Sequence, residues 1–251
     1  MSPAAIAAVI AAGLLAGAVN AIVGSGSLIT FPTLLAIGYP PVVANVSNTV
    51  GLVFGSVSGA IGYRRELAGQ GRRIAALAVP AIAGGILGAV LLLVLPQSVF
   101  HRVVPVLIIL AIVLVIVQPQ LSALMARRRA RQERQGPGAA LPAGVFGTAV
   151  YGGYFGAAQG VILISVLGLV LDDTLQRLNG LKNVLAAAVN GVAAVYFVFF
   201  AHVAWAPAVL IAVSSIAGGQ LGALVGRRLA PGALRVVIVV AGTAAVVKLL
   251  A

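Results

Sequence analysis

The chain has 251 residues, of which 61% are hydrophobic and only 8% are charged, and its net charge is +12. A soluble domain carries about 25% charged residues, so the composition excludes a soluble fold and predicts an all-α polytopic membrane protein. Cysteine is absent, which excludes disulfides and thiolate metal sites, and basic residues in short gaps between apolar runs indicate membrane topology rather than nucleic-acid binding.

Ten apolar segments follow one another along the chain. A membrane-spanning helix needs about 20 residues, so the segments at 27–38 and 160–171 are too short to cross the bilayer. The first stretch, Met1–Val23, has no positive region before it and no clear cleavage site, and we expect it to remain as a helix. The ten predicted segments are 5–23, 27–38, 41–62, 74–95, 101–118, 142–158, 160–171, 178–202, 206–226 and 232–250.

Each short segment directly follows a glycine-rich break. The first break contains Gly24-Ser25-Gly26-Ser27, and the second contains Gly156-Ala-Ala-Gln159-Gly160. Glycine interrupts helices, and a backbone freed from its helix cannot face lipid, so it must line a cavity. Interrupted apolar segments at matching positions in two halves point to the binding site of a transporter.

The positions of the basic residues indicate how the segments around the two breaks cross the membrane. If each break is the tip of a hairpin that returns to its own side, 14 of the 16 Lys and Arg residues face the cytoplasm. Each half then has five segments, so the halves 1–118 and 142–251 form an inverted-topology repeat, each with a re-entrant hairpin and three transmembrane helices. The basic linker 119–141 is expected in the cytoplasm and both termini in the periplasm. The patterns Gly84-Gly85-Ile-Leu-Gly88 and Gly218-Gly219-Gln-Leu-Gly222 predict close helix packing.

Several runs in order resemble the TauE/SafE family of sulfite exporters. They are Ala44-Asn-Val-Ser-Asn-Thr through Arg64-Arg-Glu-Leu67, Tyr151-Gly-Gly-Tyr-Phe-Gly-Ala157, and Leu178-Asn-Gly-Leu-Lys-Asn-Val184 continuing to Trp205. The resemblance covers nearly the whole chain. It implies a permease of the bacterial inner membrane for small anions, of which sulfite, sulfonates and other organosulfur acids are typical. An anion channel and a permease for small carboxylates are the alternatives.

The candidate site for the anion consists of neutral donors around the two breaks. The short segments begin at helix N-termini, which carry partial positive charge and attract anions. The four acids, Glu66, Glu133, Asp172 and Asp173, all fall in loops or at helix ends. The predicted substrate-binding residues are Asn20, Gly24, Ser25, Gly26, Ser27, Asn45, Asn48, Gly156, Gln159, Gly160, Asn179, Lys182, Asn183 and Asn190.

Several of these residues have two interpretations. Lys182 is either the fixed charge that attracts the anion or an interfacial lysine that reaches water and sets topology. Asn20 either caps the helix before the first break or faces the substrate. Asn179, Asn183 and Asn190 are spaced by four and seven residues and share one helix face. Tyr151 and Tyr154 either gate the site or belong to the interfacial aromatic belt.

The sequence contains no arrangement typical of catalysis. The two histidines are not at metal-ligand spacing, and no phosphate-binding loop or nucleophile elbow is present. We therefore expect a protein that is not an enzyme and needs no metal or cofactor. Its expected partners are a small anionic substrate and the lipid bilayer, and nucleic acid is not among them.

Overall fold

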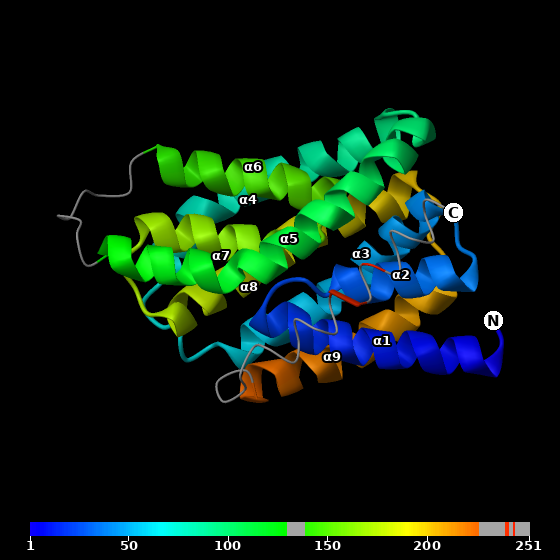
Figure 1. Ribbon diagram of the computed structural model, residues 1–251, viewed down its shortest axis with the longest axis horizontal. Helices are drawn as coiled ribbons and strands as arrows, with labels where there is room; N and C mark the ends of the chain where they lie inside the picture. The colour runs from blue at the N-terminus through cyan, green and yellow to red at the C-terminus, as the bar shows by residue number, and fades with distance from the viewer. Residues whose placement is uncertain (130–138, 226–238, 241–242, 244–251) are drawn as a thin grey trace.

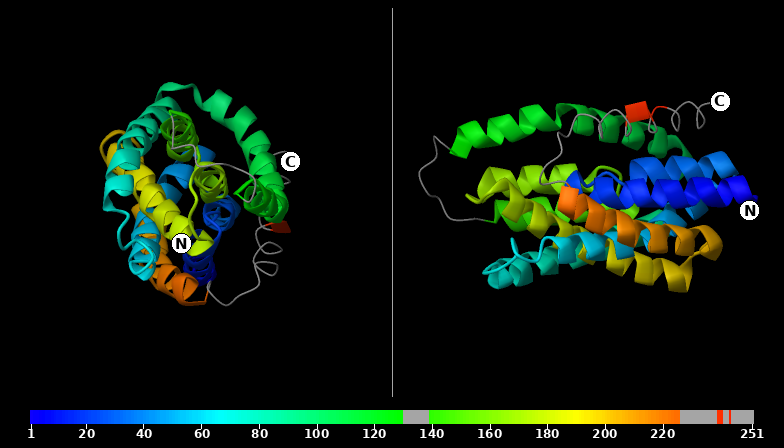
Figure 2. Two further views of the ribbon diagram at one scale, coloured as in Figure 1. Left: turned by 90° about the vertical axis from the view of Figure 1, so that its left-hand side faces the viewer. Right: turned by 90° about the horizontal axis from the view of Figure 1, so that it is seen from below.

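The computed structural model describes residues 1–129, 139–225, 239–240 and 243, and within these ranges the chain forms helices and no strand. The long helices run lengthwise through the molecule and are tilted against one another (Figures 1 and 2). The helices are α1 (Pro3–Ile22), α2 (Ser27–Ile37), α3 (Pro41–Gly62), α4 (Gly71–Val94), α5 (Gln97–Arg129), α6 (Ala140–Tyr154), α7 (Gln159–Val170), α8 (Leu175–Phe200) and α9 (Trp205–Val225).

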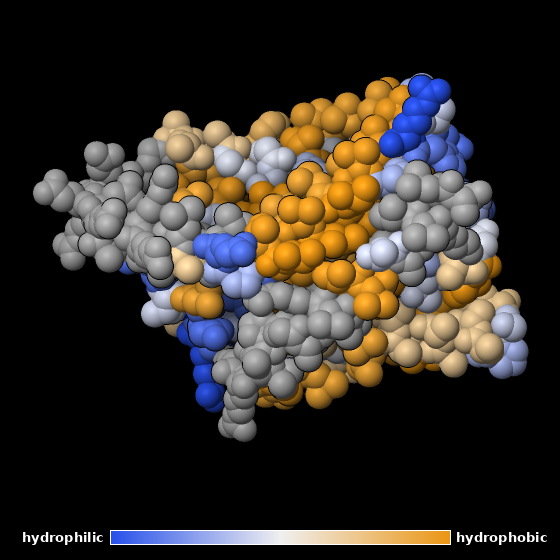
Figure 3. Space-filling model, viewed as in Figure 1, coloured by the Kyte–Doolittle hydropathy of each residue, from blue (hydrophilic) through white to orange (hydrophobic). Residues whose placement is uncertain are grey.

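Within the described residues, six helices are long and apolar enough to cross a membrane, namely α1, α3, α4, α5, α8 and α9. The visible face is apolar across its middle and hydrophilic toward its ends, as a bilayer requires (Figure 3). The prediction of an all-α polytopic membrane protein is confirmed. The predicted segment 232–250 lies almost entirely outside the described residues, and α5 continues past residue 118 to Arg129, so the first part of the predicted linker is helical.

The helices α2 and α7 have 11 and 12 residues and are too short to span the bilayer. The first break turns at Gly24, whose φ of 87° lies in the left-handed region that favours glycine. The second break turns at Gly156, with φ of 77°, and at Ala158, which has φ of 58° without being glycine. A side chain held at positive φ stores strain, and such residues cluster at functional positions.

The two short helices turn back from their breaks in opposite directions. In Figure 1, α2 runs back toward the end of the molecule where α1 begins, and α7 runs back toward the end where α6 begins. Both breaks therefore lie inside the bundle, and Val23, Ser25, Ala157 and Ala158 are all at most 1% exposed. The longer helices surround two chain reversals that meet in the interior.

Small residues allow the long helices to pack closely. α1 packs along α9, and α4 packs along α6. A Cβ atom on Gly218 would lie 2.0 Å from the carbonyl oxygen of Leu14, and one on Gly88 would lie 2.1 Å from that of Val150. The two glycine patterns therefore lie at helix contacts, which is the packing role that their sequence predicted.

One end of the bundle, which we call the basic end, carries Arg64, Arg65, Arg72, Arg73 and Arg177. There Asp173 accepts from Arg73 and from Arg177, both at 2.8 Å, and ties α4 to α8. Burial acts to raise the pKa of Asp173, but the hydrogen bonds from Arg73 and Thr174 and the two positive charges lower it on balance. The two salt bridges keep the Asp173 carboxylate charged and hold the start of α8 in place.

Candidate functional site

The two breaks touch each other. The N–H group of Gly160 donates to the carbonyl oxygen of Gly24 at 3.0 Å. The contact depends on the absence of side chains, because a Cβ on Gly24 would lie 2.3 Å from the Cα of Gly160, and the converse distance is 2.4 Å. This hydrogen bond gives partners to a backbone N–H and a carbonyl oxygen at the breaks, and lipid offers no hydrogen-bonding partner for such groups. The chain reversals thus form one junction at the core of the protein.

Four helix ends meet at this junction, and the first N–H groups of α7 donate to backbone carbonyl oxygens of the breaks, among them Gly24 and Gly156. α2 and α7 begin at the breaks, and no side-chain hydrogen bond caps either helix at Gly26 or Ala158. The dipole of each helix still places partial positive charge at its N-terminus. Two such ends approaching the same place favour an anion.

The C-terminus of α1, in contrast, is occupied by side chains of α8. The Lys182 ammonium donates to the carbonyl oxygens of Asn20 and Ala21, both at 3.2 Å. The amides of Asn179 and Asn183 also donate to the Ala21 oxygen, at 3.2 and 3.1 Å. Orphan carbonyls at a helix end carry partial negative charge, and the three side chains neutralise it.

Lys182 is 0% exposed, so it does not reach water as an interfacial lysine would. No carboxylate pairs with it among the described residues. Its amino group therefore stays inside the protein, one turn of α1 away from the glycine junction. In this conformation the ammonium faces helix carbonyls, and the structure brings it beside the predicted site rather than into open contact with a substrate.

The C-terminus of α6 is held in a similar way from the other half of the chain. The Asn45 amide, on α3, donates to the carbonyl oxygen of Tyr154 at 3.0 Å. Within the second break, the Tyr151 hydroxyl donates to the carbonyl oxygen of Ala157 at 2.5 Å. Tyr151 thus fixes the shape of the break and does not lie in an aromatic belt.

Asn48 binds the first turn of α2. Its amide donates to the Ser27 hydroxyl at 3.1 Å, and its carbonyl oxygen accepts from the Thr30 hydroxyl. Asn48 and Thr30 are both 0% exposed. The side chain therefore orients the helix whose N-terminus reaches the junction.

Asn20 and Asn190 converge on a hydroxyl that sequence reasoning missed. Both amides donate to the Ser56 oxygen, at 2.9 and 3.3 Å. Ser56 lies two helical turns after Asn48, on the same face of α3, which is a spacing that could have singled it out. Asn20 therefore does not cap α1 with its side chain, and Asn190 belongs to a second polar layer next to the junction.

Two donor side chains at the breaks lack partners within the described chain. They are the Ser25 hydroxyl and the Gln159 amide nitrogen, on residues that are 0% and 3% exposed. The side-chain amide oxygens of Asn45 and Asn179 are likewise unpaired. Buried polar groups in a native protein are normally satisfied, and exceptions mark functional positions or missing ligands. The two breaks thus each carry an unused buried donor.

Aromatic rings close the junction on the α2 side. Phe31 of α2 contacts Phe155 of the second break edge to face, with ring centroids 5.3 Å apart, and Phe100 of α5 packs on the same ring at 6.2 Å. All three rings are at most 1% exposed. They exclude water from the polar groups, and electrostatic interactions are stronger in such surroundings.

The predicted site residues therefore fall into three groups in space, one of which is the pair Asn20 and Asn190 at the Ser56 hydroxyl. Gly24, Ser25, Gly26, Ser27, Gly156, Gln159 and Gly160 form the breaks themselves. Asn45, Asn48, Asn179, Lys182 and Asn183 bond the helix ends at those breaks. The acids Glu66, Asp172 and Asp173 lie at the basic end, Glu133 lies outside the described residues, and no three His, Cys, Asp or Glu side chains in the described part are grouped to hold a metal.

Six apolar spans around paired broken helices are the architecture of a membrane transporter. The comparison with known families agrees, because the model of the family described as "Sulfite exporter TauE/SafE" matches residues 9–249. The chain belongs to the TauE/SafE family.

Curated relatives carry the same general description. "Probable membrane transporter protein" of Haemophilus influenzae is 26% identical over 84% of this chain and 81% of its own length. "Probable membrane transporter protein YfcA" of Escherichia coli K12 is 26% identical over 83% of this chain and 76% of its own. "Probable membrane transporter protein ORF9" of Sinorhizobium sp is 26% identical over 96% and 90%. No solved structure matches the chain.

Proposed function

We propose that this protein is a secondary transporter of small anions of the sulfite, sulfonate or organosulfur class, and that the anion binds where the two breaks meet. The observation that carries the proposal is the unpaired buried donor, Ser25 or Gln159, beside each of the two helix N-termini. The helix C-termini at the same place are already neutralised by Lys182 and by asparagine side chains. The two helix dipoles and the two free donors supply positive partial charge, which favours an anion.

The packing supports alternating access between two inverted halves. α1 packs along α9 as α6 packs along α4, and α3 packs against α8 at the centre. These pairs are related if residues 1–118 and 142–251 are repeats joined by the linker 119–141. The hairpins then enter from opposite sides, and each side of the membrane gains access when one hairpin moves against the other.

The inverted repeat makes a prediction about topology. We expect both termini in the periplasm and the linker in the cytoplasm of the bacterial inner membrane, because this arrangement places most basic groups inside. Reporter fusions at Ala251 and within 130–138 measure the side on which each segment lies. A cytoplasmic signal from the Ala251 fusion contradicts the inverted repeat.

Ligand binding tests the proposed site. We expect sulfite or a sulfonate to raise the melting temperature of the purified protein, and Asn48→Ala to weaken the affinity about ten- to a hundredfold, because α2 loses the bonds that orient its N-terminus. Ser214→Ala is the matched control, since that hydroxyl bonds only carbonyls of its own helix in the described chain. Equal affinities in the two folded variants place the anion elsewhere.

An uptake assay in proteoliposomes separates the alternatives. A transporter gives uptake that saturates with anion concentration, whereas a channel gives flux that rises with concentration well beyond the binding constant. Acetate and other small carboxylates, added as competitors, test the carboxylate alternative. We expect saturable uptake that sulfur oxyanions inhibit more strongly than carboxylates, because they carry more oxygen atoms for the two sets of converging donors.

A further inference from the structure

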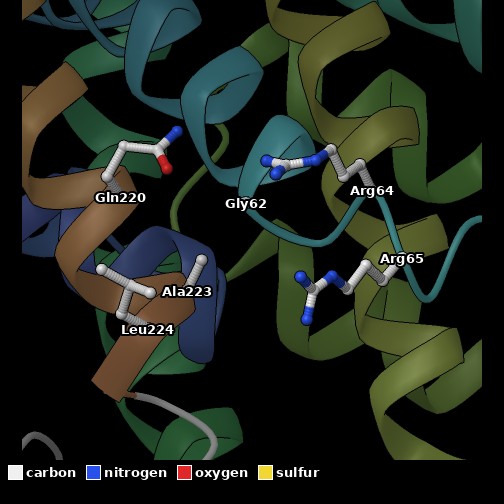
Figure 4. A pocket seen from close by; sticks show the side chains of 6 residues that line it. All are labelled: Gly62, Arg64, Arg65, Gln220, Ala223 and Leu224. Carbon is white, nitrogen blue, oxygen red and sulfur yellow. The ribbon is translucent and has the colours of Figure 1, made fainter.

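A pocket of about 180 Å³ opens at the basic end, away from the glycine junction and between the last turns of α3 and α9 (Figure 4). The close-up shows the guanidinium groups of Arg64 and Arg65 on one side of the pocket and the side chains of α9 across from them. A water molecule takes about 30 Å³ in the liquid, so the volume has room for a phosphate group with water around it. The lining residues are Gly62, Arg64, Arg65, Gln220, Ala223 and Leu224.

The arginines bring positive charge that the described chain does not neutralise. The ion pairs of the described residues join Asp173 to Arg73 and Arg177, and neither Arg64 nor Arg65 takes part in one. Both side chains are exposed, and each guanidinium presents five N–H donors in a planar fork that fits phosphate oxygens. Two such groups at one pocket are suited to an anionic group approaching from outside.

The opposite wall is fixed in place. The Gln220 amide donates to the carbonyl oxygen of Ser58 at 2.8 Å and to its hydroxyl at 3.0 Å, which ties α9 to α3. Because this amide nitrogen is already used, Gln220 shapes the pocket and leaves ligand binding to the arginines. Glu66, the acid closest in sequence, is partly exposed and is not among the residues that line the pocket.

Apolar side chains next to the pocket face outward. Ile61 of α3 is 52% exposed, and Leu221 and Leu224 of α9 are 49% and 63% exposed. Phe54, Val57 and Ile61 are three and four residues apart and share one face of α3, so the exposed apolar surface continues from the pocket along the bundle. The lipid tails of a bilayer suit such a surface in a membrane protein.

We propose that this pocket binds the phosphate of an anionic phospholipid, whose acyl chains lie along the exposed faces of α3 and α9. Basic pockets between transmembrane helices recognise anionic headgroups in this way. The lipid would bridge α3 and α9, which come from different halves of the chain. It would therefore act on the relative position of the halves and not on the anion site itself.

Native mass spectrometry of the purified protein measures the lipid bound. We expect the protein to retain phosphatidylglycerol in preference to phosphatidylcholine, and Arg64→Ala and Arg65→Ala each to lower the retained phosphatidylglycerol about fivefold. Arg72→Ala is the matched control, because Arg72 is an exposed arginine of the same end that does not line the pocket. It should keep the parent level of lipid.

Competition with soluble anions shows whether the pocket binds the phosphate of a lipid or a free phosphate. Inorganic phosphate and glycerol phosphate should leave the bound phosphatidylglycerol in place, since they lack the acyl chains. If they displace it, or raise the melting temperature of lipid-free protein through Arg64 and Arg65, the pocket binds soluble anions and the lipid proposal is wrong. Equal retention by the two pocket variants and Arg72→Ala also overturns it. Anion binding at the glycine junction is measured separately and is unaffected by either outcome.

Discussion

Replacing Lys182 by methionine is expected to lower both the melting temperature and the anion affinity. The substitution keeps most of the side-chain volume but leaves the carbonyl oxygen of Asn20 without its donor next to the fully buried position 182, at a cost of about 1–3 kcal/mol. It also removes the positive charge at the end of α1, so the negative end of that helix is no longer neutralised where the anion binds. We expect affinity to fall about ten- to a hundredfold.

Two further variants separate stability from binding. Lys182→Arg keeps the charge and the donors, and it should recover more of the affinity than of the melting temperature, because a larger group strains a closely packed site. Arg102→Met removes an exposed charge from the opposite end of the bundle and should change neither quantity. If Lys182→Met unfolds more easily but binds the anion like the parent, the lysine only caps α1, and its proposed part in anion binding is wrong.

Alanine at Gly24 or Gly160 is expected to abolish transport. A Cβ on either residue would lie within 2.4 Å of the other residue's Cα, and no flexible side chain is available to move aside. Gly24 also has φ of 87°, where a side chain costs about 1–2 kcal/mol. The breaks would have to separate, and the hydrogen bond between them would be lost. Uptake by proteoliposomes and the melting temperature measure the two effects.

Gly191→Ala is the control for this pair. Gly191 lies inside α8, and among the described residues no atom of a packing neighbour would come within 4 Å of a Cβ added to it. Alanine there should stabilise the helix by about 0.5–1 kcal/mol. Transport by this variant should match the parent. Should Gly24→Ala and Gly160→Ala behave in the same way as Gly191→Ala, the two breaks do not need to touch for function.

Much of the fold was predictable because membranes constrain sequences strongly. Segment length and hydropathy identified the long helices, and the shortness of 27–38 and 160–171 identified α2 and α7. Glycine content located the breaks, since few other residues accept positive φ. The left-handed Ala158 was not predictable, because nothing in an alanine indicates that the surrounding packing will impose such a conformation.

The partners of the polar residues were harder to predict. Spacing placed Asn179 and Asn183 on one face of α8, and both indeed bond one atom, the carbonyl oxygen of Ala21. That this face meets the end of α1 depends on tertiary packing, and a backbone carbonyl leaves no mark in the sequence. Ser56 and Thr30 were missed for a related reason: hydroxyl residues are common in membrane helices, where they often bond their own backbone.

At each break, side chains from one half of the chain bond the carbonyl oxygens of the other half, so the order of synthesis affects folding. The carbonyl end of α1 is satisfied by α8, more than 150 residues later, and the end of α6 is satisfied by Asn45, which is synthesised long before it. Until both partners are present, each freed backbone would sit in the membrane unsatisfied, at a cost of several kcal/mol per group. Neither half can therefore complete its own broken helix, and the chain must assemble as a whole.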